Sequence, residues 1–83
     1  MKKILSRYFV KNSDVEVIFV VSSNLHRLAY SASRQVLQVQ FKRGAEYRYY
    51  GVSPRIYNAL KRAGSHGRFF YYAIRLRYAY IRL

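Results

Sequence analysis

Apolar and polar side chains alternate through the middle of the chain, and this pattern predicts β-strands. The clearest strand covers residues 37–42, where hydrophobic side chains at every second position share one face. Weaker alternation predicts neighbouring strands over residues 25–30 and 46–50. Gly44 lies in the short connection before the last of these strands and can adopt a positive φ there. We therefore expect a three-stranded antiparallel meander.

An earlier segment, residues 15–21, is β-branched and aromatic on both faces. That composition is typical of a strand that is buried on two sides. A fourth strand in the same sheet is the interpretation we prefer. The alternative is that this strand pairs with the sheet edge of a protein partner or with its own copy, which would make the chain an interaction module. Residues 1–14 show no clear period and end in a turn-like run.

The strongest helix signal begins at Ser53, a good N-cap, and at Pro54, which suits the first helical position. Gly64 ends the pattern. Between them apolar side chains recur at helical spacing, at Ile56, Ala59, Leu60 and Ala63. This spacing predicts a helix over residues 54–63 with one apolar stripe.

A second helix is expected after Ser65, which can cap it, and it includes the apolar residues from Phe69 to Ile74. Residues 78–82 alternate and are expected to be extended. The predicted fold class is therefore α+β. It is a small antiparallel β-meander of three strands, possibly with a fourth N-terminal strand, packed by one or two C-terminal helices.

Charge separates this sequence from an ordinary small domain. The 83 residues carry sixteen Lys and Arg against three acids, a net charge of +13, and residues 47–83 hold eight cations and no carboxylate. Such a field attracts a polyanion, so we expect RNA or another nucleic acid as the partner. Cysteine is absent, and neither an export signal nor a bilayer-length apolar run is visible. We therefore expect a cytoplasmic protein with no membrane partner.

Arginine and tyrosine side chains are the candidate contacts, because guanidinium groups bind phosphates through paired N–H groups and tyrosine rings stack on bases. Tyr47 and Tyr49 share one strand face and are expected in the core, which leaves Arg48 and Tyr50 exposed. The first helix turns three cations to solvent, opposite its apolar stripe, and more arginines follow. The predicted nucleic-acid-binding residues are Arg48, Tyr50, Arg55, Lys61, Arg62, Arg68, Arg75 and Arg77.

The sequence contains few residues that could act in catalysis. His26, His66 and the three carboxylates form no metal-binding spacing, and neither a Gly-rich phosphate loop nor a nucleophile with a neighbouring base is present. We expect a non-catalytic protein with no metal and no cofactor. The alternative is a metal-independent, toxin-like ribonuclease in which His66, beside Ser65 and Arg68, moves the proton of a 2′-hydroxyl.

Several short runs of the sequence match one known family in the correct order. They are Ser22-Ser23-Asn24-Leu25, Leu28, Tyr30, Leu37, Val39, Phe41, Gly44, Tyr47-Arg48-Tyr49, Val52, Tyr57, Leu60, Ala63, Ser65, Gly67, Phe69-Phe70, Ile74-Arg75, Tyr78 and Arg82. Residues 22–83 thus resemble the KTSC domain, a module named for the C-terminus of some lysyl-tRNA synthetases. The resemblance implies an RNA-binding domain that also occurs alone as a small bacterial or phage protein. Residues 1–21 have no counterpart in that short module and are interpreted as an N-terminal extension with a strand.

The sequence departs from the family pattern at several positions. Ser31 stands where an Asp is common, and residues 33–35 occupy a turn that usually has Gly. Tyr71 and Leu76 replace an Asn and an acid. These changes raise both the charge and the apolar content. A protein interaction or inhibitor module of a phage or mobile element is therefore kept as an alternative function.

Overall fold

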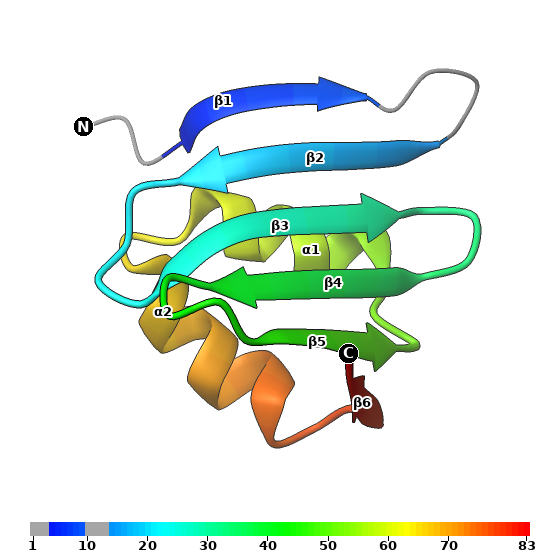
Figure 1. The fold of residues 1–83 in the computed structure, drawn as a ribbon. Coiled ribbons are helices and arrows are strands. Elements are labelled where there is room, and N and C mark those ends of the chain that lie inside the picture. The colour runs from blue at the N-terminus through cyan, green and yellow to red at the C-terminus, as the bar shows by residue number, and fades with distance from the viewer. Residues whose placement is uncertain (1–3, 10–13) are drawn as a thin grey trace.

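The structure is a computed structural model that describes residues 4–9 and 14–83. Each strand in it pairs antiparallel with the next strand along the chain, so the sheet order is β1-β2-β3-β4-β5-β6 (Figure 1). The strands are β1 (Ile4–Phe9), β2 (Val15–Val20), β3 (Leu25–Ser31), β4 (Val36–Phe41), β5 (Glu46–Tyr50) and β6 (Tyr80–Arg82). The helices are α1 (Pro54–Arg62), α2 (His66–Phe69) and its π-helical continuation η1 (Phe70–Arg75).

The expected α+β class and the antiparallel meander are confirmed, but the expected number of strands is wrong. Five strands of five to seven residues and the three-residue β6 form the described sheet. The preferred fourth strand is β2, and the extended tail is β6. β1 was not expected from the sequence. Its register with β2 shifts between Ile4 and Ser6, and an irregularity of this kind breaks the alternation on which sequence analysis relies.

The helices cover one face of the sheet and leave the other face open (Figure 1). Hydrophobic side chains from β2 to β5 meet α1 and η1 in a single core. Its members are Ile18, Val20, Leu25, Leu28, Tyr30, Leu37, Val39, Tyr49, Val52, Tyr57, Leu60, Phe70 and Ile74. Tyr30 anchors the middle of this layer, because its ring stacks on Tyr57 at a centroid distance of 4.1 Å and its hydroxyl donates to the Val52 oxygen at 2.6 Å.

β2 lies inside the sheet and not at its edge. Val17 pairs with Tyr8 of β1 on one side and with Ala29 of β3 on the other. Val17 and Ile18, which alternate between the two faces, are both buried, as the sequence predicts. The alternative in which this strand adds to a partner's sheet or to its own copy is corrected, since both hydrogen-bonding edges of β2 are occupied.

The helix ends follow the expected capping. The side chain of Ser53 accepts a hydrogen bond from the Ile56 amide at 3.3 Å, with Pro54 in the first turn. Ser65 accepts from the Arg68 amide at 3.2 Å and begins α2. Within the described ranges, no helix has the length and apolar character needed to cross a membrane.

Candidate functional site

The three carboxylates of the chain all accept hydrogen bonds from other residues of the chain. Glu16 on β2 is buried against α1, where its Oε1 atom accepts from the Tyr57 hydroxyl at 2.7 Å and from Lys61 Nζ at 3.0 Å. Arg7 Nε lies 3.7 Å from the second oxygen of Glu16. This cluster ties β1, β2 and α1 together and uses two of the cations.

The other two acids contact residues near the two ends of β3. Asp14 accepts from the Ser33 amide at 2.6 Å and from the Ser31 hydroxyl at 3.0 Å. Hydrogen bonding by the Ser33 side chain, and then by the Ser33 amide and Ser31, holds the pKa of Asp14 below its ordinary value. Glu46 accepts from Arg27 at 2.7 Å and from Gln38 at 3.0 Å. Ion pairs of the described side chains therefore involve only three cations, and most of the positive charge has no internal acid to balance it.

A cleft of about 950 Å³ lies where the β4–β5 turn, β6 and η1 meet, and we call it the aromatic cleft. Figure 1 shows η1 turning below β5 and returning as β6 to form this end of the molecule. None of its lining residues is acidic. They are Ser23, Asn24, Phe41, Lys42, Arg43, Tyr47, Tyr49, Phe70, Tyr71, Arg75, Leu76, Arg77, Tyr78 and Tyr80.

The floor of the aromatic cleft is a set of rings in mutual contact. Phe70 lies edge-on to Phe41 and to Tyr49, at centroid distances of 5.7 and 5.3 Å. Tyr80 lies 5.8 Å from Tyr47 and 5.5 Å from Tyr49, and it remains 55% exposed. Burial raises the pKa of Tyr49 to about 12. The buried rings thus hold the exposed Tyr80 in place from below.

Cations stand over the rings at the rim of the cleft. The Arg75 guanidinium lies 5.0 Å from the centroid of Tyr71, which is 43% exposed, and that of Arg43 lies 5.7 Å from the centroid of Phe41. Lys42 is exposed beside Arg43. This arrangement offers flat apolar surfaces and phosphate-binding groups within one hollow.

A second hollow, which we call the helical groove, runs between α1 and the α2–η1 segment. Its lining is mostly small or apolar, with arginines and no acid. The lining residues are Arg55, Ile56, Ala59, Ala63, Gly64, Ser65, Arg68, Phe69, Tyr72, Ala73, Arg77 and Tyr78. Arg77 and Tyr78 also line the aromatic cleft, so the two hollows adjoin.

The structure brings some of the predicted site residues together and separates others. Arg75 and Arg77 line the aromatic cleft, and Arg55 and Arg68 line the helical groove with Arg77. Arg62 is exposed on α1 but lines neither hollow. The structure therefore places Arg55, Arg68, Arg75 and Arg77 in two adjoining hollows.

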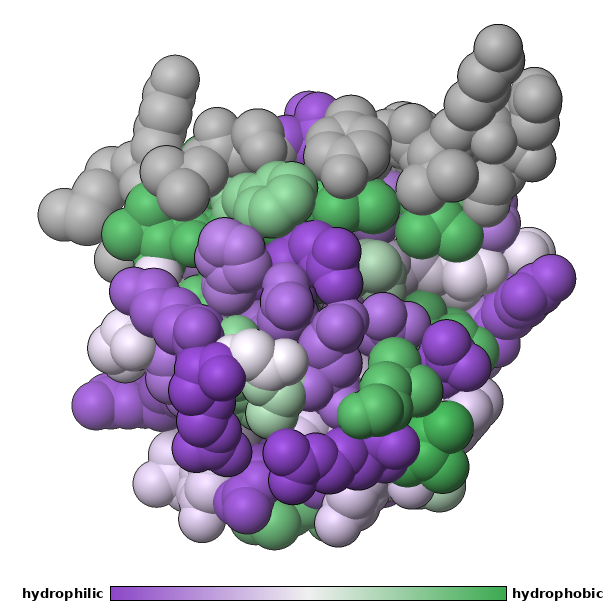
Figure 2. All heavy atoms as spheres, in the orientation of Figure 1, coloured by the Kyte–Doolittle hydropathy of each residue, from purple (hydrophilic) through white to green (hydrophobic). Residues whose placement is uncertain are grey.

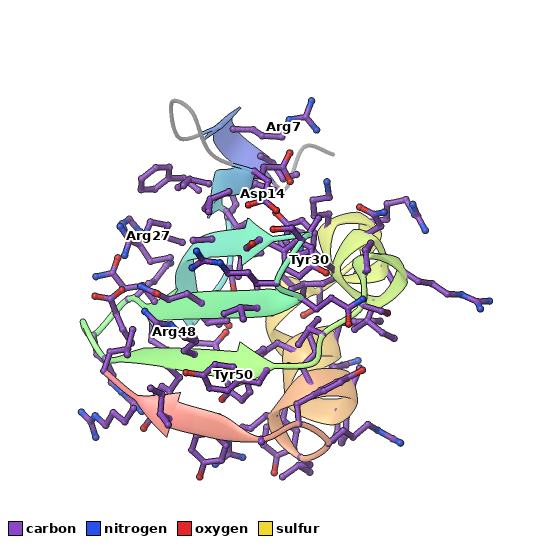
Figure 3. The ribbon with its side chains drawn as sticks, turned by 90° about the vertical axis from the view of Figure 1, so that its right-hand side faces the viewer. Arg7, Asp14, Arg27, Tyr30, Arg48 and Tyr50 are labelled. Carbon is purple, nitrogen blue, oxygen red and sulfur yellow. The ribbon has the colours of Figure 1, made fainter. Side chains whose placement is uncertain are left out.

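Arg48 and Tyr50 lie on the open face of the sheet, away from both hollows. Tyr49 between them points to the helices, and strand alternation sends its neighbours to the other side. Figure 3 shows the strands that carry Arg27 and Arg48 from the side, with the helices beyond the other face. Arg48 donates to Gln38 at 3.2 Å, and Figure 2 shows mainly hydrophilic residues across the middle of this face. Arg48 and Tyr50 therefore do not share a surface with the predicted cations of the helices.

Two further expectations change with the tertiary structure. Lys61 does not point freely to solvent, because its side chain is only 19% exposed and is paired with Glu16. His66 is 1% exposed, and its Nδ1 atom lies 2.9 Å from the Leu60 oxygen at the end of α1. A proton-transfer role for His66 in RNA cleavage therefore lacks access to substrate in this structure.

Sequence reasoning missed part of the aromatic cleft. Gly44 has a φ of 101°, which matches the expected left-handed position. Lys42 and Arg43 lie in the turn around it, and no pattern in the local sequence indicates that this turn faces η1. Tyr80 was predicted only as part of an extended tail. Tyr49 is in the core as expected, whereas Tyr47 is half-buried and also lines the cleft. The available signal was the high content of tyrosine and arginine near the end of the chain.

The aromatic cleft presents rings and cations. Within residues 4–9 and 14–83, no three His, Asp or Glu side chains come together as a metal site requires. The cleft volume lies within the range of about 300 to 1,000 Å³ that is typical of pockets for ligand-sized groups. Such a volume admits a base with its sugar and phosphate as well as a single anion.

These features define a class of small α+β domain, with a meander sheet covered by helices on one face and a basic, aromatic cleft at one end. The chain belongs to the KTSC domain family, whose sequence model matches residues 21–78. The match begins one residue before the predicted boundary. It covers well over half of the chain, and the motif resemblance is thereby confirmed.

Similar proteins agree with this assignment. The crystal structure of a KTSC domain protein from Yersinia pestis has a TM-score of 0.70 and 26% identity, covering 94% of this chain and 96% of that chain. An uncharacterized protein from Stutzerimonas stutzeri is 47% identical over 49 residues, which are 59% of this chain and 69% of that protein. A protein from Tsukamurella paurometabola is 40% identical over 50 residues, 60% of this chain and 75% of its own.

Proposed function

We propose that the protein binds RNA in the aromatic cleft without catalysing a reaction. The observation that carries this proposal is the joint presence of exposed tyrosines and four cations in one hollow whose lining contains no carboxylate. Tyrosine rings stack on unpaired bases, and each such contact contributes about 1 to 3 kcal/mol with little dependence on base identity. Arginine binds phosphate oxygens through two parallel N–H groups.

The division of charge inside the fold supports the same proposal. All three acids are used in internal contacts, so they do not neutralise the arginines at the cleft. A protein with a net charge of +13 is relieved of self-repulsion when a polyanion binds. The family's place at the C-terminus of some lysyl-tRNA synthetases favours RNA as that polyanion, because those enzymes act on an RNA substrate.

In this mechanism the buried rings act as a rigid support. Phe70 packs against Tyr49, and Tyr49 in turn contacts Tyr47 and Tyr80, so little side-chain freedom is lost when a base stacks. Arg75 and Arg43 stand over neighbouring rings, where they can contact phosphates on either side of the stacked base. Discrimination between bases is expected to be weak, because stacking dominates over hydrogen bonding to base edges.

The test is fluorescence anisotropy with a labelled single-stranded RNA and purified, nucleic-acid-free protein. We expect Tyr71→Ala and Arg75→Gln to weaken binding, while both variants keep the melting temperature of the parent because the two side chains are exposed. Arg34→Gln, at an exposed position outside both hollows, is the matched control for Arg75→Gln. If the Arg34 and Arg75 variants bind RNA equally well, the cleft is not the site.

A further inference from the structure

The aromatic cleft and the helical groove adjoin at Arg77 and Tyr78, which line both. The Nε–H group of Arg77 donates to the backbone oxygen of Tyr72 at 3.3 Å, so a hydrogen bond helps to hold this exposed cation at the junction. A polyanion that leaves the cleft past Arg77 meets the groove next. The two hollows are therefore continuous for a chain-like ligand.

The linings of the two hollows suit different parts of such a ligand. The cleft is lined by seven aromatic rings, whereas the groove is lined by three, Phe69, Tyr72 and Tyr78, beside the small side chains of Ala59, Ala63 and Ala73. Arg55 and Arg68 are exposed on the two sides of the groove, on α1 and α2. Bases therefore gain more in the cleft, and a sugar-phosphate backbone is better matched to the groove.

We infer that the ligand is a single-stranded RNA longer than the cleft, with bases stacked in the aromatic cleft and its backbone continuing past Arg77 into the helical groove. This inference rests on the proposed function and adds the class of RNA and its path. Arg68 and Arg55 bind phosphates of the continuing strand. A duplex is a poor ligand, because its bases are already paired and stacked and do not reach the tyrosines.

The experiment compares two single-stranded RNAs of about four and about twelve nucleotides, which span the common site sizes of small single-strand-binding domains. Binding is measured by anisotropy over a range of salt concentrations. Wild-type protein binds the longer RNA more tightly. The double variant Arg55→Glu/Arg68→Glu removes that advantage and reduces the salt slope for the longer RNA by about 1.4, because each lost phosphate contact removes about 0.7.

The matched control is Arg34→Glu/Arg62→Glu, which changes the net charge equally at two exposed positions that line neither hollow. For the short RNA, the groove and control variants lose affinity to the same small extent, through the long-range field alone. For the long RNA, the groove variant loses clearly more. Tyr71→Ala weakens both RNAs, because its ring belongs to the cleft that every RNA occupies.

The possible failures are distinguishable. If wild-type protein binds neither RNA, the proposed function itself is wrong. If both lengths bind equally, or if the control variant weakens the long RNA as much as the groove variant does, the path through the groove is overturned while the cleft remains the RNA site. A duplex of the longer sequence that binds as tightly as the single strand contradicts the assignment of a single-stranded ligand.

Discussion

The hydroxyl of Tyr57 on α1 donates a hydrogen bond of 2.7 Å to the buried carboxylate of Glu16 on β2. This contact joins the first helix to a strand that lies wholly outside the residues matched by the family model. The same oxygen of Glu16 also pairs with Lys61, and this ion pair removes that cation from the exposed basic surface.

Loss of this hydroxyl is expected to lower stability without changing the shape of the core. Tyr57→Phe leaves the buried Glu16 carboxylate with one donor fewer, and the free energy of unfolding should fall by about 1 to 3 kcal/mol in urea denaturation. Tyr71→Phe is the control, because Tyr71 is exposed and should tolerate the change. Equal stability of the Tyr57 variant and the parent would show that Lys61 and Arg7 suffice for Glu16.

Alkaline pH is expected to destabilise the fold through Tyr49. Its folded pKa of about 12 lies above the ordinary value of 10.0, so the unfolded chain releases this proton first as the pH rises. The stability contribution of neutral Tyr49 is therefore complete below pH 10 and is lost as the pH rises through about 12. Tyr49→Phe should reduce this loss when unfolding is followed by circular dichroism. An unchanged alkaline profile in that variant contradicts the assignment to Tyr49.

Gln35 has a φ of 55°, in the left-handed region, at the turn where the family pattern usually has Gly. A side chain in this conformation costs about 1 to 2 kcal/mol, and Gly avoids that cost but loses more backbone entropy on folding. Gln35→Gly is expected to raise the free energy of unfolding by about 0.5 to 1 kcal/mol. The neighbouring Arg34→Gly should instead be neutral or destabilising. A higher melting temperature for the Arg34 variant than for the Gln35 variant would refute the strain argument.

Gly67 and Asn24 belong to two separate runs of the family motif and lie close together in the structure. A Cβ atom at Gly67 would overlap the Asn24 side-chain oxygen, which accepts a hydrogen bond from the Ser22 hydroxyl. Gly67→Ala should therefore destabilise the protein by about 1 kcal/mol, although alanine favours a helix. In an Asn24→Ala background the same change should become neutral or stabilising. A double-mutant cycle measures this coupling, and additive effects would mean that the two residues do not compete for space.

Salt dependence should distinguish the cleft from the open face of the sheet. With about five phosphates neutralised, log K for single-stranded RNA is expected to fall with log salt at a slope near about −3.5. Arg43→Glu and Arg75→Glu should each make that slope shallower by about 0.7, whereas Arg48→Glu should leave it nearly unchanged. The Arg48 side chain lies on the opposite face and contacts Gln38. A larger effect at Arg48 than at Arg75 would place RNA on the open sheet.

Local chemistry made several elements predictable from the sequence. Ser53 and Pro54 define the start of α1, because capping and the fixed φ of proline act within one helical turn. The period-two pattern located β4, and Gly44 marked a turn with positive φ. The net charge required no structure at all.

Only the tertiary structure decided the strand count and the layout of the site. The register of β1 depends on its pairing with β2, and the irregularity between Ile4 and Ser6 hides its period. The aromatic cleft joins a turn at Lys42 and Arg43 to Arg75 and Tyr80, which are separated by more than thirty residues in the sequence. Sequence periodicity reports which face of its own element a residue occupies. The proximity of distant elements is instead set by how their apolar faces pack together, and that packing is a property of the whole chain.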